Sequence, residues 1–238
     1  CYCARPDLGL FVVADGMGGH ASGEVASQMA LDAVREFFAS TQDDPERTWP
    51  YKMDRTKGYE ENRLITGIKL ANLRIYETAQ REAKKRGMGT TATALVLLPG
   101  RYFIGQVGDS RAYLLRDGEF LQITRDHSYV QEQVDAGLLT PEQARVHPYS
   151  NVITRCVGAG SDVVPDVYFG DLRAGDVLLL ASDGLTGMLE DEQLVKILAD
   201  PQGPQAWVDR MITEANRRGG LDNITTILVR IEAVAPPT

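Results

Sequence analysis

The chain has 238 residues, of which 43% are hydrophobic and 24% are charged, so it is long enough to bury a sizeable core. With 25 lysines and arginines against 33 acidic residues, its formal net charge of −8 argues against a broad contact with nucleic acid or anionic lipid. No apolar stretch approaches the roughly 20 residues that span a bilayer, and no signal-peptide pattern is present. We therefore expect a cytoplasmic, monomeric protein with no membrane contact in this segment.

Cysteine and histidine spacing argues against a zinc site. The cysteines lack paired CxxC spacing and are expected to be free thiols, since disulfides are rare in the cytosol; they are Cys1, Cys3 and Cys156. The histidines are scattered and lack the HExxH spacing of a zinc enzyme; they are His20, His127 and His147.

Hydrophobic periodicity predicts helices and short strands over the first half of the chain. An apolar run ending at Ala14 is typical of a buried strand, and apolar steps of three and four predict two amphipathic helices. The polar connection between the helices is expected to be ordered by Trp49 and Tyr51. In chain order, the predicted elements are a strand over 8–14, a helix from near residue 22, a connection over 40–58, a helix over 59–86, and strands over 92–98, 101–107, 112–116 and 119–123.

Tight turns join the strands between residues 92 and 123, which predicts one antiparallel meander. Residues from about 125 to 160 change character, with a polar helix near 128–136 and a helix start at Thr140, and are interpreted as a flap that leaves the sheet. The remaining predicted elements are strands over 163–169, 176–182 and 223–231 and helices over 191–199 and 204–218. Together they predict a single α+β domain over 1–238, a sandwich of two antiparallel sheets flanked by helices.

Four aspartates lie where apolar strands begin or end, beside small or turn residues. They are Asp15 in FVVADG, Asp109 in IGQVGDS, Asp183 in LLLASDG and Asp222 in GLDNITTILV. Any one of them could be a turn residue, like the aspartate of the Asp117-Gly118 turn. As a set they are expected to converge, because buried strands of packed sheets share a common rim.

Converging carboxylates need a counter-charge. Two unit charges about 4 Å apart repel by roughly 4 kcal/mol at an effective dielectric near 20, so the cluster is expected to hold protons or divalent cations. All-oxygen ligands favour Mg²⁺ or Mn²⁺ over zinc. Two such ions about 3.5–4 Å apart activate a water and bind a phosphate oxygen, which predicts an anionic phosphoester as substrate. The segment GMGGHASGE lacks the GK[ST] ending and the GxGxxG spacing of nucleotide loops, so nucleotide binding is not favoured.

Six motifs in order carry a family resemblance: VVADGMGGH, GTTATALVLL, VGDSRAYLLRDG, ITRDHS, LLLASDGLTG and DNITTILV. Together they resemble the bacterial branch of the metal-dependent protein phosphatase family, type 2C. The resemblance implies an αββα sandwich with a binuclear Mn²⁺ or Mg²⁺ centre that dephosphorylates phosphoserine and phosphothreonine in proteins. It also implies signalling partners that are phosphorylated proteins, including a serine/threonine protein kinase, and a flap that takes part in substrate choice.

The resemblance also implies roles for individual residues. Asp15 would bridge the two ions, Gly16 would offer its carbonyl to one of them, and Asp183 and Asp222 would complete the second. A third, weaker ion would be held by Asp109 with help from Asp183. Asp15 and Asp183 are therefore the predicted catalytic residues.

Two features depart from the family pattern. Family members begin with a strand that carries a phosphate-binding arginine and, soon after it, an acidic residue; nothing before Leu8 matches it. The segment Cys1 to Asp7 resembles the connecting loop after that strand, so the domain is predicted to lack its first strand, and Arg5 is not expected to replace the arginine. Eukaryotic members carry a general-acid histidine where this chain has Met17. His20 is shifted, and both a catalytic and a structural role stay open for it.

Smaller roles are also predicted. Ser110 and Arg111 are expected to fix their turn, Asn223 to satisfy backbone groups beside Asp222, and His127 to be structural. Ser161 and Asp162 are expected to close the flap at the surface. Two alternative functions stay open: a pseudophosphatase that only binds phosphoproteins, and a partner-switching regulatory phosphatase.

Overall fold

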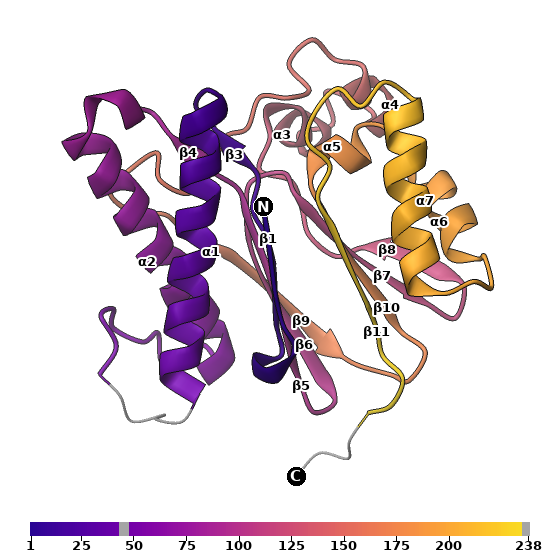
Figure 1. The fold of residues 1–238 in the computed structure, drawn as a ribbon, viewed down its shortest axis with the longest axis horizontal. Coiled ribbons are helices and arrows are strands. Elements are labelled where there is room, and N and C mark those ends of the chain that lie inside the picture. The colour runs from indigo at the N-terminus through magenta and orange to yellow at the C-terminus, as the bar shows by residue number, and fades with distance from the viewer. Residues whose placement is uncertain (43–47, 235–238) are drawn as a thin grey trace.

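Two antiparallel sheets pack face to face between two layers of helices (Figure 1). This computed structural model describes residues 1–42 and 48–234, except for the side chains of His20 and Ala21. One layer consists of α1 (His20–Gln42) and α2 (Tyr59–Arg81). The other consists of α5 (Asp183–Thr186), α6 (Asp191–Leu198) and α7 (Pro204–Arg217). The predicted αββα sandwich is confirmed.

Every pair of neighbouring strands is antiparallel. The first sheet has the order β1 (Tyr2–Arg5), β2 (Leu10–Val13), β5 (Ala92–Leu98), β6 (Arg101–Val107), β9 (Asp166–Asp171). The second has the order β11 (Thr226–Arg230), β10 (Val177–Ala181), β7 (Arg111–Arg116), β8 (Glu119–Gln122). A small ribbon pairs β3 (Gly16–Met17) with β4 (Gly89–Thr90).

The central strands β2 and β10 are apolar throughout because both of their faces are covered. In β5, Ala94 and Val96 face the α1/α2 layer, whereas Leu95 faces the other sheet. In β10, Leu178 faces the first sheet and Leu179 packs under α6 and α7. Strands buried on both faces lose the alternation of a half-exposed strand. No helix in the described ranges is long and apolar enough to cross a membrane.

The predicted single meander was wrong. β5 and β6 form one hairpin and β7 and β8 form another, but β7 pairs with β10 in the second sheet. The chain crosses between the sheets at Gly108 to Ser110. Gly108 has a φ of +104° and packs against Thr91 so closely that a Cβ would lie 2.6 Å from Thr91 Cγ2. A short connection therefore does not guarantee that two strands pair, since a tight turn can also join two layers.

Two predicted boundaries were also wrong. Residues Cys1 to Asp7 are not a connecting loop, because Tyr2–Arg5 forms strand β1 against β2. The second helix ends at Arg81 rather than Arg86, since Glu82 is extended with φ −111° and ψ 103°, and a short 3-10 turn (Ala83–Lys85) follows.

The polar connection before α2 is ordered by aromatic packing, as predicted. The Trp49 ring lies 5.4 Å from the Phe37 ring and 5.2 Å from the Tyr59 ring. Tyr51 donates a hydrogen bond to the Lys69 carbonyl at 3.4 Å. The middle of this connection, residues 43–47, lies outside the described residues.

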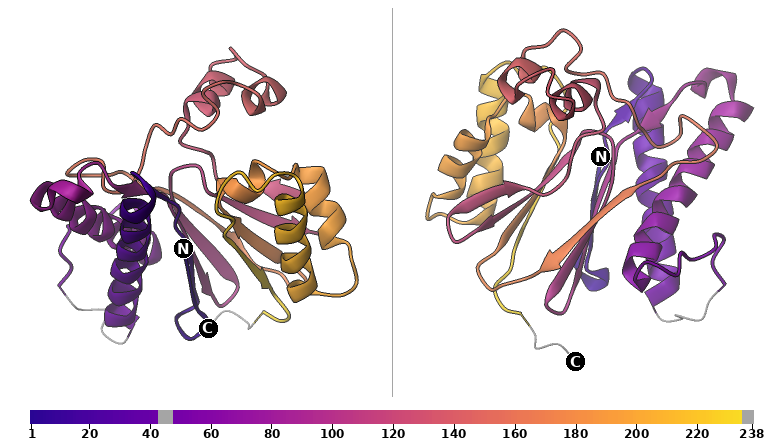
Figure 2. Two further views of the ribbon diagram at one scale, coloured as in Figure 1. Left: turned by 45° about the horizontal axis from the view of Figure 1, so that its top comes forward. Right: turned by 180° about the vertical axis from the view of Figure 1, so that it is seen from behind.

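The flap projects beyond the ends of the sheets (Figure 2). It carries two short helices, α3 (Tyr129–Asp135) and α4 (Pro141–Arg145). Ser128 caps the first by accepting the Gln131 N–H, and Thr140 caps the second by accepting the Gln143 N–H. Both helices were predicted from these residues.

Candidate active site

Asp15 follows β2 at the rim where the two sheets end. Its main chain is held on both sides: its N–H donates to Thr91 Oγ1 at 2.9 Å, and its carbonyl accepts the Thr91 N–H at 2.8 Å. Thr90 Oγ1 donates to the same carbonyl at 2.8 Å. The backbone is therefore rigid at this point, while the side chain is left half-buried and free to take a ligand.

Asp183 and Asp222 are brought together by a close backbone approach. Asp183 begins α5 directly after β10, and Asp222 precedes β11. A Cβ on Gly184 would lie 2.2 Å from the Asn223 carbonyl oxygen, so only glycine lets the two segments pack this tightly. Ser182 joins the same segments, because its Oγ accepts the Thr225 N–H at 3.0 Å.

Asp109 lies on the crossing between β6 and β7. Gln106 is fully buried, and its Nε2 donates to the carbonyls of Gly108 at 2.9 Å and Ser110 at 2.7 Å. These two hydrogen bonds hold the backbone of the crossing in place. Ser110 Oγ is hydrogen bonded to Thr91 Oγ1 at 2.8 Å. Thr91 thus connects the backbone of Asp15 to the loop of Asp109.

The rim carboxyls act on one another electrostatically. Burial, a hydrogen bond with the Asp183 carboxyl and the charges of Asp183 and Asp222 raise the pKa of Asp15 to about 8. Burial and the charges of Asp183 and Asp126 raise the pKa of Asp109 to about 7. The structure thus brings the four predicted aspartates to one rim, where like charges oppose full ionisation.

The residues present fit a hard divalent cation. Oδ1 of Asp183 is buried and has no hydrogen-bond partner among the described residues, although a buried carboxylate oxygen normally has one. Oxygen donors without imidazole or thiolate suit Mg²⁺ or Mn²⁺. In the described ranges, no three Asp, Glu, His or Cys side chains are placed so that together they could hold a metal ion. Mg²⁺ does not need three, because it keeps several waters and binds proteins through one or two carboxylates.

Gly16 is explained by packing as well as by its predicted role. A Cβ on Gly16 would lie 1.9 Å from the Gly23 carbonyl oxygen, so the turn after Asp15 can rest on α1 only if this residue is glycine. Met17 follows it in β3. The side chain of His20 lies outside the described residues, so the structure does not decide its role.

Other predicted residues have structural partners. Ser110 is fully buried, and Arg111 Nε and NH2 donate to the Asp126 carboxylate at 2.7–3.0 Å, so both fix the turn as predicted. Asp162 is exposed and pairs with Lys69 at 2.9 Å, in agreement with its predicted surface position. Ser161 is also exposed. The three cysteines are free thiols, as expected.

Two further roles can be located. Asn223 differs from the prediction, because its backbone carbonyl, not its side chain, contacts Ser182 Oγ at 3.3 Å. Arg5 lies at the end of β1 that pairs with Leu10, whereas Tyr2 pairs with Val13 near Asp15. Arg5 Nε donates to Asp7 at 2.8 Å, so it lies at the far end of the sheet and does not replace a phosphate-binding arginine at the rim.

The residues that hold these backbones in place were missed. They share burial and a hydroxyl or amide group, and they are Thr90, Thr91, Ser182 and Gln106. A signal existed in the sequence, since polar residues interrupt otherwise apolar strands in GTTATALVLL and RYFIGQV. A buried polar group requires a partner, so such interruptions mark long-range hydrogen bonds.

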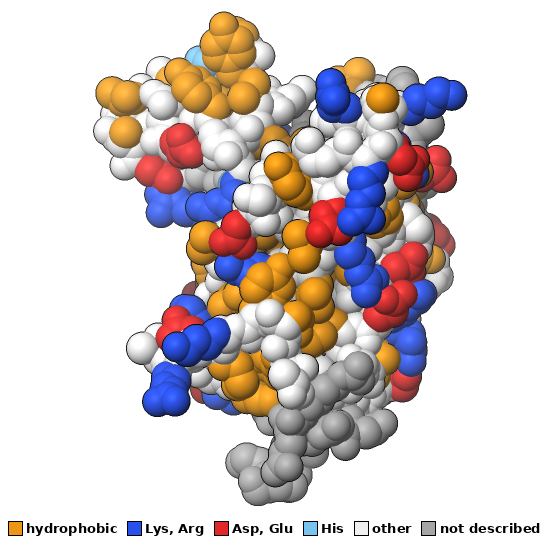
Figure 3. Space-filling view, turned by 90° about the vertical axis from the view of Figure 1, so that its left-hand side faces the viewer, with side chains coloured by type: hydrophobic (Ala, Val, Ile, Leu, Met, Phe, Trp, Pro, Cys, Tyr) orange, Lys and Arg blue, Asp and Glu red, His pale blue; other side chains and the backbone are white. Residues whose placement is uncertain are grey.

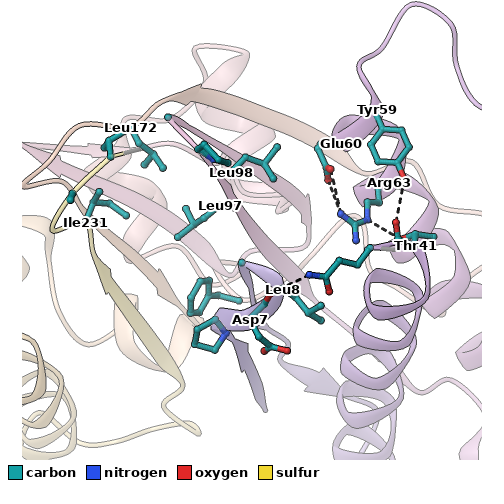
Figure 4. A pocket seen from close by; sticks show the side chains of 18 residues that line it. Asp7, Leu8, Thr41, Tyr59, Glu60, Arg63, Leu97, Leu98, Leu172 and Ile231 are labelled. Carbon is teal, nitrogen blue, oxygen red and sulfur yellow. Dashed lines mark hydrogen bonds and ion pairs between the residues drawn. The ribbon is translucent and has the colours of Figure 1, made fainter. Parts of the chain in front are cut away.

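A cavity of about 670 Å³ lies away from the rim carboxylates (Figure 4). It is lined by the turn from Pro6 to Gly9, and β2 runs from there toward Asp15 at the opposite end. On one wall, Arg63 NH1 contacts Glu60 at 3.3 Å and Arg63 Nε donates to Thr41 Oγ1 at 2.9 Å. This charge pair is internally matched, so the cavity does not share the chemistry of the rim.

An αββα sandwich with an oxygen-only rim at the strand ends defines a metal-dependent phosphohydrolase. The chain belongs to the protein phosphatase 2C family, whose family model matches residues 2–228. It is therefore a metal-dependent protein serine/threonine phosphatase, in agreement with the predicted family, fold and reaction.

Bacterial relatives resemble nearly the whole chain. A putative protein phosphatase 2C-type of Streptococcus pyogenes serotype M6 is 41% identical over 232 residues, which are 96% of this chain and 88% of the relative. The serine/threonine protein phosphatase PstP of Mycobacterium tuberculosis is 38% identical over 97% of this chain and 45% of the relative. The crystal structure of the PstP catalytic domain in complex with two manganese ions matches with a TM-score of 0.76 and 37% identity, over 92% of this chain and 86% of that one.

Proposed function

We propose that this chain hydrolyses phosphoserine and phosphothreonine in proteins at the rim of Asp15, Asp109, Asp183 and Asp222, with Mn²⁺ or Mg²⁺ as cofactor. The single observation that carries the proposal is that Asp183 Oδ1, in a carboxyl that raises the pKa of Asp15, is buried without a hydrogen-bond partner among the described residues. The manganese ions of the PstP catalytic domain, whose fold is similar, support the choice of metal.

The proposed ligands follow the family pattern. Asp15 would be shared by two ions, the Gly16 carbonyl would bind one of them, and Asp183 and Asp222 would complete the other. Asp109, together with Asp183, would hold a third. Bound cations would lower the pKa of a water molecule and neutralise the phosphate.

The chain's own residues prepare this chemistry. The Asp183 carboxyl raises the pKa of Asp15, so a cation that binds there would displace any proton that the pair holds. Without cations, the four carboxyls would repel a phosphate dianion. Thr91 and Ser182 hold the backbones of Asp15 and Asp183 in place, so little reorganisation is needed when ligands bind.

Residues upstream of Cys1 in a longer chain would begin at this rim. The Ala14 N–H donates to the Cys1 carbonyl at 3.0 Å, one residue from Asp15. Met17 cannot donate a proton to a leaving alkoxide, so another group or solvent must do so.

The flap supports a protein as substrate. Hydrophobic side chains gather on it, at the upper left of Figure 3. Leu138 is 67% exposed, Val146 83% and Tyr149 58%, and such exposed apolar groups mark contact surfaces. We infer that phosphorylated proteins, a serine/threonine protein kinase among them, are dephosphorylated in the cytoplasm by a monomer.

The test compares wild-type protein with Asp183→Asn in the full natural chain. Hydrolysis of p-nitrophenyl phosphate and of a phosphothreonine peptide is measured against Mn²⁺ concentration. Loss of a ligand should reduce the rate by more than about 100-fold, since even outer-shell partners of a metal are worth 10- to 100-fold. Asp117→Asn, at an exposed turn, serves as the matched control and should be unaffected.

Three outcomes separate the candidates. An Asp183→Asn rate equal to that of the wild type would overturn the proposed site. Tight phosphopeptide binding without Mn²⁺-dependent turnover would instead favour the binding module. Turnover restricted to one phosphoprotein among several would favour the partner-switching phosphatase.

A further inference from the structure

His127 is a buried imidazole with both ring nitrogens engaged, and the proposed reaction uses neither. Its side chain is 7% exposed. Nδ1 accepts the N–H of Gly108 at 3.0 Å, and Gly108 directly precedes Asp109. Nε2 lies 3.0 Å from Asp166 Oδ2 at the start of β9. One ring therefore joins the loop of a proposed metal ligand to the edge strand of the first sheet.

The hydrogen bonds determine the tautomer. A backbone N–H can only donate, so Nδ1 of His127 carries the lone pair and Nε2 carries the proton. Nε2 then donates to Asp166, and Arg155 NH1, which is 3.1 Å from Nε2, finds no lone pair there. Arg155 NH1 instead donates to Asp166 Oδ1 and to the Val164 carbonyl, both at 2.9 Å.

The same residues form the stem of the flap. The Thr154 N–H donates to the His127 carbonyl at 2.8 Å, and the Tyr129 N–H donates to the Val152 carbonyl at 2.8 Å. The flap between these two hydrogen bonds therefore leaves the body of the protein at His127. Arg155 lies on the segment of this stem that returns from the flap to the body of the protein.

The returning end of the flap is held by α2 and, through a bridge between Val157 and Thr90, by the segment that also holds the Asp15 carbonyl. Asn72 of α2 is buried, and its side chain accepts the Gly158 N–H at 2.7 Å and donates to the Gly160 carbonyl at 2.9 Å. A Cβ on Gly158 would lie 2.2 Å from Ile75 Cγ2, so this anchor is tightly packed.

We propose that His127 is a positioning residue that fixes the flap stem relative to the Asp109 loop. A protein substrate that displaces the flap would displace Gly108 and, through it, the Asp109 carboxyl. His127 thereby couples substrate docking at the flap to the affinity of the cation that Asp109 holds. This inference rests on the proposed function for the role of Asp109.

Two substitutions separate the two bonds of the ring. In His127→Asn, the amide oxygen lies near the position of Nδ1 and can accept the Gly108 N–H, but the side chain is too short to reach Asp166. In His127→Gln, the longer amide can donate to Asp166 but leaves the Gly108 N–H without an acceptor. His147→Gln is the matched control, because His147 accepts the Tyr149 N–H within the flap itself.

The primary readouts do not require turnover. Mn²⁺ affinity is measured by calorimetric titration and amide exchange of Gly108 by NMR, followed by KM for a phosphoprotein and for p-nitrophenyl phosphate. His127→Gln should weaken Mn²⁺ binding about tenfold and speed Gly108 exchange. His127→Asn should preserve both within about twofold but raise the KM for the phosphoprotein alone, since it loosens only the flap. His147→Gln should leave Mn²⁺ binding and Gly108 exchange unchanged.

Equal losses in the Asn and Gln variants would mean that the ring only fills space, and would overturn the proposal. Unchanged Mn²⁺ affinity and Gly108 exchange in His127→Gln would overturn it too. If a His127 variant does not fold, Asp166→Ala at a partly exposed position removes the same bond and should raise the KM as His127→Asn does; no change there would count against it. An inactive wild type would refute the proposed function alone, because metal binding and amide exchange would still report on His127.

Discussion

Two sets of buried acidic side chains differ in whether a cation faces them. Asp176 is 1% exposed and receives Arg116 Nε at 2.8 Å and NH2 at 2.7 Å. Although burial alone would raise it, hydrogen bonds from Arg116 and the Arg173 N–H lower the pKa of Asp176. Asp15 and Asp109 have no such ion pair within the described residues, and burial raises the pKa of both.

The difference separates structural from functional carboxylates. A buried carboxylate that pairs with its own arginine has its charge neutralised within the protein, and removing either partner leaves an unpaired group. Carboxylates that lie near one another without an ion pair of their own destabilise the protein until a ligand supplies charge, which is typical of functional sites. The comparison therefore predicts opposite effects of neutralising the two sets.

The largest effect is expected for Asp15→Asn. Hydrolysis of p-nitrophenyl phosphate with Mn²⁺ should fall by more than about 100-fold, because a shared ligand is lost. The metal-free variant should nevertheless unfold about 2 °C or more above the wild type at pH 8, since one like charge is removed. Calorimetry and kinetics check both; a variant that is both active and less stable would contradict the comparison.

Asp176→Ala should lower the stability of the protein and leave the Mn²⁺ dependence of its activity unchanged. Breaking a buried pair costs about 3 kcal/mol, which corresponds to a fall in Tm of about 6–12 °C for a chain of this size. The Mn²⁺ concentration for half-maximal activity should stay unchanged at a temperature where the variant is folded. A normal Tm, measured by calorimetry, would show that this pair is not structural.

Manganese should stabilise the wild type. At about 100 times its dissociation constant, a bound ion adds about 2.7 kcal/mol, or roughly 5–10 °C in Tm. Removal by chelation should reverse the shift, and Asp222→Asn should reduce it. Thermal scans with and without Mn²⁺ measure the shift, and equal scans would argue that the rim does not bind the ion.

A smaller effect is expected from pH in the absence of metal. The folded pKa of Asp15 is raised from 3.8 to about 8 and that of Asp109 from 3.8 to about 7, so the folded state binds more protons than the unfolded state between these values. Stability from these two groups is therefore lost as pH rises from about 4 to about 8. Urea unfolding at pH 5, 6.5 and 8 should show the fall, and saturating Mn²⁺ should suppress it. A rise in stability over this range would oppose the assignment.

The smallest effect is expected for Arg5→Ala. Arg5 pairs with Asp7 at the surface, at the far end of β1 from the rim. Neither Tm nor Mn²⁺-dependent activity should change. A large rise in the KM for phosphopeptides would show that Arg5 reaches the substrate after all.

Much of the candidate site was predictable because its signals are local. An apolar run that stops at Asp15 or Asp183 predicts both a buried strand and the position of its end. Thr140 followed by Pro141 predicts a helix start, because threonine caps helices. The family motifs added proposed roles for Asp109 and Asp222. None of these required knowledge of distant contacts.

The sequence by itself determined the positions of most of the longer strands and helices, the four aspartates and the sandwich class, because periodicity, caps and turn residues act over a few positions. Only the tertiary structure decided that β7 pairs with β10, that Tyr2–Arg5 pairs with β2, and that Thr91 links Asp15 to Ser110. The β7–β10 pairing and the Asp15–Thr91 hydrogen bond depend on partners tens of residues away. The hydrophobic pattern of a strand predicts that the strand will pair and be buried, but the packing of the whole core selects the neighbouring strand.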